Sequence, residues 1–87
     1  MRKKLKFVET CSACPEQYDV FLGDKQVGYL RLRSGWFRVD FPECGGETIY
    51  EHYFDDGWKG CFDDTERDYF LKEAEKAIIK KIKSIEK

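Results

Sequence analysis

Apolar and polar residues alternate from residue 27 to residue 41, on both sides of the dipeptide Ser34-Gly35. A period of two is typical of a β-strand, and a Gly-containing dipeptide between two alternating runs is typical of a two-residue hairpin loop. A loop at Ser34-Gly35 places Arg31 directly opposite Arg38, and opposed residues share a face of the sheet. One face of this predicted hairpin is apolar and contains Leu30, Leu32, Phe37, Val39 and Phe41.

The other face of the hairpin is basic and aromatic. It contains Tyr29, Arg31, Arg33, Trp36, Arg38 and Asp40. The Arg31–Arg38 pair costs stability unless an anion or an acidic residue lies beside it, because like charges repel across adjacent strands. Guanidinium groups with aromatic rings suit a phosphate with a stacked base, or an acidic protein surface. The alternative is an ordinary solvated face, in which Arg33 stacks on Trp36 and the arginines are neutralised by Asp19, Asp40 and Glu51.

Three further strands are predicted around the hairpin, at residues 4–10, 17–22 and 48–54. The register of the second strand depends on the length of the loop near residues 23–25. A three-residue loop pairs Leu22 with Gln26 and puts Tyr18, Val20 and Leu22 on the apolar face, whereas a four-residue loop turns that strand over. We favour the three-residue loop because it buries more aliphatic surface.

An amphipathic helix is predicted near the C-terminal end. Apolar residues recur there at steps of three and four: Phe70, Leu71, Ala74, Ala77, Ile78, Ile82 and Ile85. Asp63 or Asp64 can cap this helix, Glu66 follows three residues after Asp63, and lysines crowd the C-terminal half. We therefore expect a single α+β domain over residues 1–87: an antiparallel meander of four to five strands, with one helix packed on its apolar face.

The overall charge adds little to this picture. Sixteen Lys and Arg residues against 17 Asp and Glu residues give a net charge of −1, so no overall field draws the protein toward nucleic acid or an anionic membrane. No apolar run approaches the ~18–20 residues of a membrane span, and the basic start lacks the apolar segment of a signal peptide. We therefore expect a cytoplasmic protein that does not contact a membrane.

Four cysteines are candidate zinc ligands: Cys11, Cys14, Cys44 and Cys61. In the cytoplasm such residues are usually thiols or metal ligands, not disulfides. The Cys-x2-Cys spacing of Cys11 and Cys14 lets both thiolates bind one ion from a single turn, and Cys44 precedes a flexible Gly-Gly pair. Without zinc, Cys61 is a small buried apolar residue and Cys44 is a loop thiol. No other cofactor is expected.

The sequence contains no constellation typical of an active site. His52 is the single histidine and has no partner set that would activate a nucleophile. The aspartates between residues 55 and 64 lack the spacing of an EF-hand calcium loop. We therefore expect that the protein is not an enzyme.

The segment GWKGCFDD at residues 57–64, which leads into a lysine-rich helix, resembles small uncharacterised proteins of phages and prophages of Gram-positive bacteria. The resemblance covers about the C-terminal third of the chain and the hairpin sequence GYLRLR at residues 28–33. It implies a small accessory protein with a host-directed binding role, and it brings no catalytic motif.

The sequence thus predicts a small non-enzymatic binding module. Its candidate site consists of Tyr29, Arg31, Arg33, Trp36 and Arg38, and its partner is an acidic protein surface or a phosphate-bearing ligand. Two alternatives stay open: a nucleic-acid-binding domain in which Lys3, Lys4 and Lys6 extend the basic face, and a small zinc-stabilised structural domain. The oligomeric state is not specified, and a homodimer through the open sheet face is a further candidate arrangement.

Overall fold

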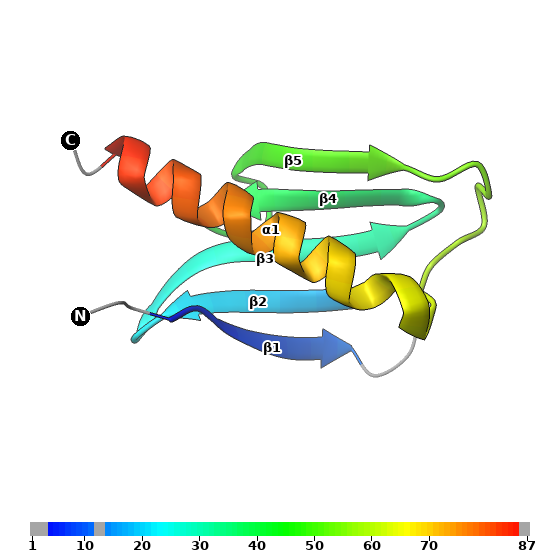
Figure 1. Cartoon of the computed structure of the whole chain (residues 1–87), viewed down its shortest axis with the longest axis horizontal. Helices are drawn as coiled ribbons and strands as arrows, with labels where there is room; N and C mark the ends of the chain where they lie inside the picture. The colour runs from blue at the N-terminus through cyan, green and yellow to red at the C-terminus, as the bar shows by residue number, and fades with distance from the viewer. Residues whose placement is uncertain (1–3, 12–13, 86–87) are drawn as a thin grey trace.

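A computed structural model describes residues 4–11 and 14–85 of the protein. Five antiparallel strands lie side by side in chain order, and one helix crosses one face of the sheet (Figure 1). The elements are β1 (Lys6–Cys11), β2 (Glu16–Leu22), β3 (Lys25–Arg33), β4 (Trp36–Phe41), β5 (Glu47–Tyr53) and α1 (Asp64–Ile85). The predicted α+β fold, a meander with a C-terminal helix, is confirmed.

The β3–β4 hairpin has the predicted register. Arg31 pairs with Arg38 across the two strands, and the loop consists of Ser34 and Gly35. Both loop residues have positive φ angles, 53° and 76°, as a type I′ hairpin turn requires. Glycine is also needed at position 35 for space, because a Cβ atom there would lie 2.5 Å from the carbonyl oxygen of Asp56.

The turn between β2 and β3 is shorter than predicted, but farther from the turn the two strands pair in the predicted register. Tyr18 pairs with Leu30, as expected, whereas Leu22 pairs with Lys25 across a two-residue turn and not with Gln26. The difference is absorbed by a β-bulge, in which Val27 is the extra residue of β3. Val27 is buried as a result, with 3% of its surface exposed.

The hydrophobic core lies between the sheet and α1. Phe70, Ala74 and Ile78 of the helix are buried in one cluster with strand residues that include the predicted Leu30, Leu32, Phe37 and Val39. Ile85, the last residue of the predicted stripe, is 57% exposed and lies outside this core. The helix reaches the sheet closely over Gly28, where a Cβ atom would lie 2.5 Å from Cδ1 of Ile78.

The start of the helix lies at the predicted capping residues, Asp63 and Glu66, which form one of the two hydrogen bonds of a capping box. The backbone N–H of Asp63 donates to Oε2 of Glu66 over 2.8 Å, and the carbonyl of Asp63 accepts the first helical hydrogen bonds. Asp64 and Glu66 lie in the first turn and Lys83 in the last, as the helix dipole favours. Within the described part of the chain, no helix is both long and apolar enough to cross a membrane.

Candidate functional site

The sheet face opposite α1 carries the predicted basic and aromatic residues. The cross-strand pairs place Gln17, Arg31, Arg38 and Glu51 in one row across β2 to β5. Arg33, Trp36 and Tyr53 form the neighbouring row, at the end of the sheet where β3 turns into β4. No helix of the described residues covers this face, so we call it the open face (Figure 1).

Arg38 is the most firmly held arginine of the open face. Its guanidinium lies 5.1 Å from the ring centroid of Trp36 and 5.9 Å from that of Tyr29. Its Nε atom lies 3.2 Å from Oδ2 of the buried Asp40, although no hydrogen bond of good geometry joins the two atoms. Asp40 therefore neutralises Arg38, one of the roles expected of the acidic neighbours.

Trp36 is held on its other flank by β5. Its indole Nε1–H donates to Oε1 of Glu51 over 2.9 Å, and the Tyr53 hydroxyl donates to the same oxygen over 3.1 Å. The rings of Trp36 and Tyr53 are parallel within 3°, with centroids 5.9 Å apart. Glu51 is thus occupied by two aromatic donors, and the cation that lies over Trp36 is Arg38, not Arg33 as the solvated-face alternative assumed.

Tyr29 belongs to the open face but is largely covered. Only 8% of its surface is exposed, and its hydroxyl donates to Oε1 of Gln17 over 2.8 Å. Burial raises the pKa of Tyr29, and the nearby Cys44 adds to this effect while Arg31 and Arg38 oppose it. Tyr29 therefore positions Arg38 and offers little surface of its own to a partner.

Arg31 and Arg33 differ from Arg38, because neither forms an ion pair with any residue in the ranges 4–11 and 14–85. The Nε atom of Arg31 is buried and has no acceptor within the same ranges. An open depression of about 220 Å³ lies here, lined by Arg31, Arg33, Ser34, Trp36 and Arg38. The structure thus brings four of the five predicted site residues around one hollow.

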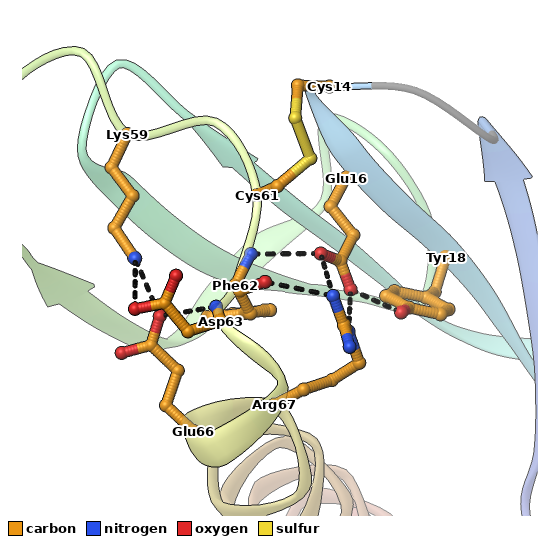
Figure 2. The surroundings of a disulfide bond; sticks show 9 residues. All are labelled: Cys14, Glu16, Tyr18, Lys59, Cys61, Phe62, Asp63, Glu66 and Arg67. Atoms are coloured by element: carbon orange, nitrogen blue, oxygen red, sulfur yellow. Dashed lines mark hydrogen bonds and ion pairs between the residues drawn. A yellow bond between two sulfur atoms is a disulfide. The ribbon is translucent and has the colours of Figure 1, made fainter.

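The four cysteines are not brought together as one cluster. Cys14 and Cys61 form a disulfide, so the expectation of thiols or metal ligands is wrong for these two residues (Figure 2). Cys11 and Cys44 are free thiols, the first half-buried and the second exposed. No group of three or more potential metal ligands occurs among the residues that the structure describes. A site with all four cysteines would require the reduced protein.

A buried carboxylate lies beside the disulfide and was not predicted as a functional residue. Glu16 is 4% exposed and accepts hydrogen bonds from the Tyr18 hydroxyl, from the Phe62 N–H over 2.9 Å and from Nε of Arg67 over 2.8 Å (Figure 2). Arg67 also donates to the Phe62 carbonyl over 2.9 Å (Figure 2) and to Asp64 over 2.5 Å. The sequence does contain a signal for the burial of Glu16. This residue lies two positions before Tyr18 and four before Val20, so all three side chains lie on the core face of β2.

The surroundings of Glu16 keep it ionised. Burial alone would raise the pKa of Glu16, but the hydrogen bonds from Arg67, Tyr18 and Phe62, together with the charge of Arg67, lower it below its ordinary value. Burial and the neighbouring carboxylate raise the pKa of Tyr18, so this phenol stays protonated. All the donors to Glu16 are protein groups. The network therefore has a structural role: it links β2 to the start of α1.

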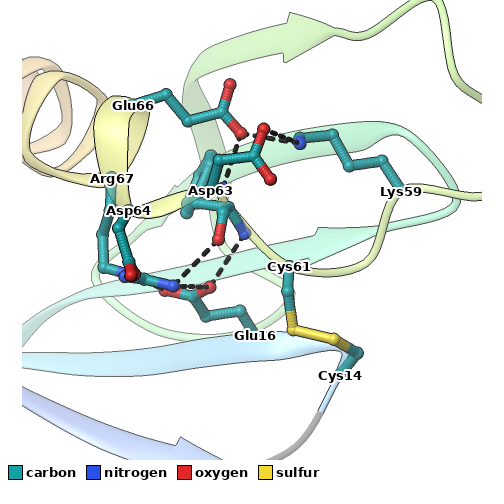
Figure 3. A network of polar contacts seen from close by, with 9 residues as sticks. Cys14, Glu16, Lys59, Cys61, Asp63, Asp64, Glu66 and Arg67 are labelled. Atoms are coloured by element: carbon teal, nitrogen blue, oxygen red, sulfur yellow. Dashed lines mark hydrogen bonds and ion pairs between the residues drawn. A yellow bond between two sulfur atoms is a disulfide. The ribbon is translucent and has the colours of Figure 1, made fainter.

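The connector between β5 and α1 is fixed to the tip of the β3–β4 hairpin. The Gly35 N–H donates to the Lys59 carbonyl over 2.8 Å, and the Lys59 ammonium lies 2.6 Å from Oε2 of Glu66 (Figure 3). Trp58, in this connector, is 94% exposed. His52 packs its ring against Phe54 and Phe70, with centroids 4.7 and 5.0 Å away, in agreement with a structural role.

The basic residues of the nucleic-acid alternative are only partly described. Lys3 lies outside the described residues, and Lys6 lies in β1 at the far end of the open face. Lys4 instead lines a groove near the β2–β3 turn. Comparison with known proteins gives no further guide, since no family model, curated protein or solved structure matches the chain.

Proposed function

We propose that the protein is a non-enzymatic binding module that uses the open face of its sheet to bind an acidic protein surface. The observation that carries the proposal is the state of Arg31. This residue lies directly opposite Arg38, and its buried Nε atom lacks an acceptor within the described residues. A carboxylate from a partner, bound by the outer nitrogens of the Arg31 guanidinium, would offset the repulsion between the two arginines.

The size of the hollow supports an acidic side chain over a whole small molecule. Its volume of about 220 Å³ lies below the ~300–1,000 Å³ of pockets that enclose drug-sized ligands. Two strongly exposed aromatic residues near the hairpin tip favour a protein partner: Tyr53 is 67% exposed and Trp58 is 94% exposed. Such residues are enriched at the centres of protein interfaces. A host-directed partner would agree with the resemblance to phage proteins.

A nucleic-acid partner has less support. Asp19 and Glu51 interrupt the basic character of the open face, so a phosphate backbone would meet carboxylates beside the arginines. The ring of Trp36 already stacks on Tyr53 and contacts Arg38, which limits its use as a platform for a base.

The first prediction concerns Arg31→Ala. Because this change removes a cation that has no acidic partner, the free energy of unfolding should stay the same or rise slightly, as urea denaturation would show. Binding of an oligoglutamate peptide, followed by NMR signals of the open face, should weaken by ~1–3 kcal/mol. Lys72→Ala removes an exposed cation from α1 and should leave both quantities unchanged.

Two outcomes would contradict the proposal. If Arg31→Ala and Trp36→Ala both destabilise the fold while peptide binding survives, the open face is structural. If a single-stranded oligonucleotide binds this face more tightly than the peptide, with an affinity that falls steeply as salt rises, the nucleic-acid alternative replaces the protein partner.

A further inference from the structure

An apolar groove lies at the end of the molecule opposite the hairpin tip. Figure 1 shows that the start of β1, the β2–β3 turn and the C-terminal end of α1 all lie at this end of the sheet. The groove has a volume of about 530 Å³, within the ~300–1,000 Å³ range of small-molecule pockets. Its apolar walls are Leu22, Val27, Phe41, Ile82 and Ile85.

Most of these walls are partly exposed to solvent. Leu22, Phe41 and Ile82 are only partly buried, and Ile85 is 57% exposed although it continues the apolar stripe of α1. The β-bulge turns Val27 into the groove's inner wall, so the groove depends on an irregularity of the sheet. These adjoining apolar side chains offer a surface that an aliphatic group could cover.

The polar groups around the groove are cationic. Lys4, Gly23 and Lys25 are the remaining lining residues, and among residues 4–11 and 14–85 no carboxylate lines the groove; Asp24 belongs to the same turn but not to the lining. Neither lysine forms an ion pair with a residue that the structure describes. Lys83, in the last turn of α1, offsets the partial negative charge of the helix C-terminus.

We propose that this groove binds a small amphipathic anion, an aliphatic chain that ends in a carboxylate. The chain would cover the exposed surfaces of Leu22, Ile82 and Ile85, which removes apolar area from water. The carboxylate would lie between the ammonium groups of Lys4 and Lys25. This site is separate from the open face and does not depend on the partner proposed for it.

The test uses the full chain with ¹³C-labelled methyl groups, titrated with octanoate and, separately, with 1-octanol. Octanoate should shift the methyl signals of Leu22, Val27, Ile82 and Ile85 in a saturable way, and octanol should bind at least about fivefold more weakly because it lacks the charge. The double change Lys4→Glu and Lys25→Glu should weaken octanoate binding by about tenfold or more.

Two controls make the test specific. Lys72→Glu and Arg31→Ala alter charge elsewhere in the molecule, and each should change octanoate affinity by less than about twofold. The melting temperature of the Lys4→Glu, Lys25→Glu protein should equal that of the unaltered protein, since both lysines are exposed.

Three results would overturn the proposal. The first is the absence of a saturable shift at the four residues, and the second is octanol binding as tight as that of octanoate. The third is sedimentation of the protein with phosphatidylglycerol vesicles, lost in Ile85→Asn, without saturable octanoate binding. That last result would assign the groove to a lipid surface and not to a free amphiphile.

Discussion

Glu16 shows how a single side chain fastens two distant parts of the chain. Its carboxylate is buried, and its strongest charged partner, Arg67, comes from the first turns of α1. A buried carboxylate is tolerated only while its hydrogen bonds and its cation are in place. The stability of the molecule should therefore depend on Arg67 far more than on the exposed ion pairs of the helix.

Arg67→Met should lower the free energy of unfolding by about 2–3 kcal/mol, because it leaves a buried carboxylate without its cation. This is below the ~3–5 kcal/mol of fully buried pairs, since Arg67 is itself about one-third exposed. The matched control is Asp64→Asn, which removes the exposed partner of the same arginine and should cost less than about 0.5 kcal/mol. Urea denaturation measures both, and equal effects would contradict the assigned role.

The pH dependence of stability gives a second prediction for Glu16. Its pKa in the folded protein lies below the ordinary value of 4.5, so the unfolded chain binds this proton more tightly. The resulting stabilisation is complete above the ordinary pKa and is lost as the pH falls through the lower, folded value. Glu16→Gln should flatten the loss of stability between about pH 5 and pH 2, measured by urea denaturation. A remaining slope is expected from Glu66, whose pKa is also lowered.

At the scale of the elements, the close packing of α1 on the sheet depends on one glycine. Ile78 is fully buried, and its Cδ1 atom occupies the space above Gly28 where another residue would carry a Cβ atom. The helix can therefore approach β3 closely, and its apolar residues reach the core without a gap. Close packing of this kind makes both positions sensitive to a change of one carbon atom.

Ile78→Ala should cost about 2–4 kcal/mol as a large-to-small change in the core. Gly28→Ala should cost about 1–3 kcal/mol through overpacking. In an Ile78→Val background, which lacks the clashing Cδ1 atom, Gly28→Ala should be cheaper by at least about 0.5 kcal/mol. Strictly additive free energies of unfolding in this double-mutant cycle would show that Ile78 does not pack on Gly28.

At the scale of the whole molecule, the disulfide joins the start of β2 to the connector that precedes α1. Cys14 and Cys61 are 47 residues apart in the sequence, and the same connector also packs on the tip of the β3–β4 hairpin. The disulfide and the contact with the hairpin tip therefore hold three segments together at one end of the sheet. Closing a loop of this length restricts the unfolded chain strongly.

The paired change Cys14→Ser and Cys61→Ser should lower the free energy of unfolding by about 2–4 kcal/mol, near the ~4 kcal/mol that chain entropy gives for such a loop. Cys44→Ser changes an exposed free thiol and should have an effect below about 0.5 kcal/mol. Unfolding curves of the oxidised proteins measure both. Equal stability with and without the bond would contradict its structural role.

The zinc hypothesis is tested on the reduced protein. If all four cysteines bind one ion, the reduced protein should take up about one equivalent of zinc, and a strong chelator should lower its melting temperature. Reduced protein that takes up no zinc and melts identically with and without chelator would remove this hypothesis.

Local pattern was sufficient to predict the sheet order, the β3–β4 register, the helix stripe and the capping residues at the helix start. Each of these depends on residues a few positions apart: alternation across Ser34-Gly35 sets the two faces of the hairpin, and Asp63 with Glu66 marks the helix start. The composition of the open face followed from the same alternation, because a strand with one buried face leaves little freedom of register.

Tertiary structure decided what each polar group contacts. Glu16 meets Arg67 and Cys14 meets Cys61 across about half the chain, Arg38 and not Arg33 lies over Trp36, and the bulge buries Val27. None of these follows from spacing, because hydrogen bonds, ion pairs and disulfides form only between atoms brought within a few ångströms. Those distances exist only after the helix has packed on the sheet and the connector has closed on the hairpin tip.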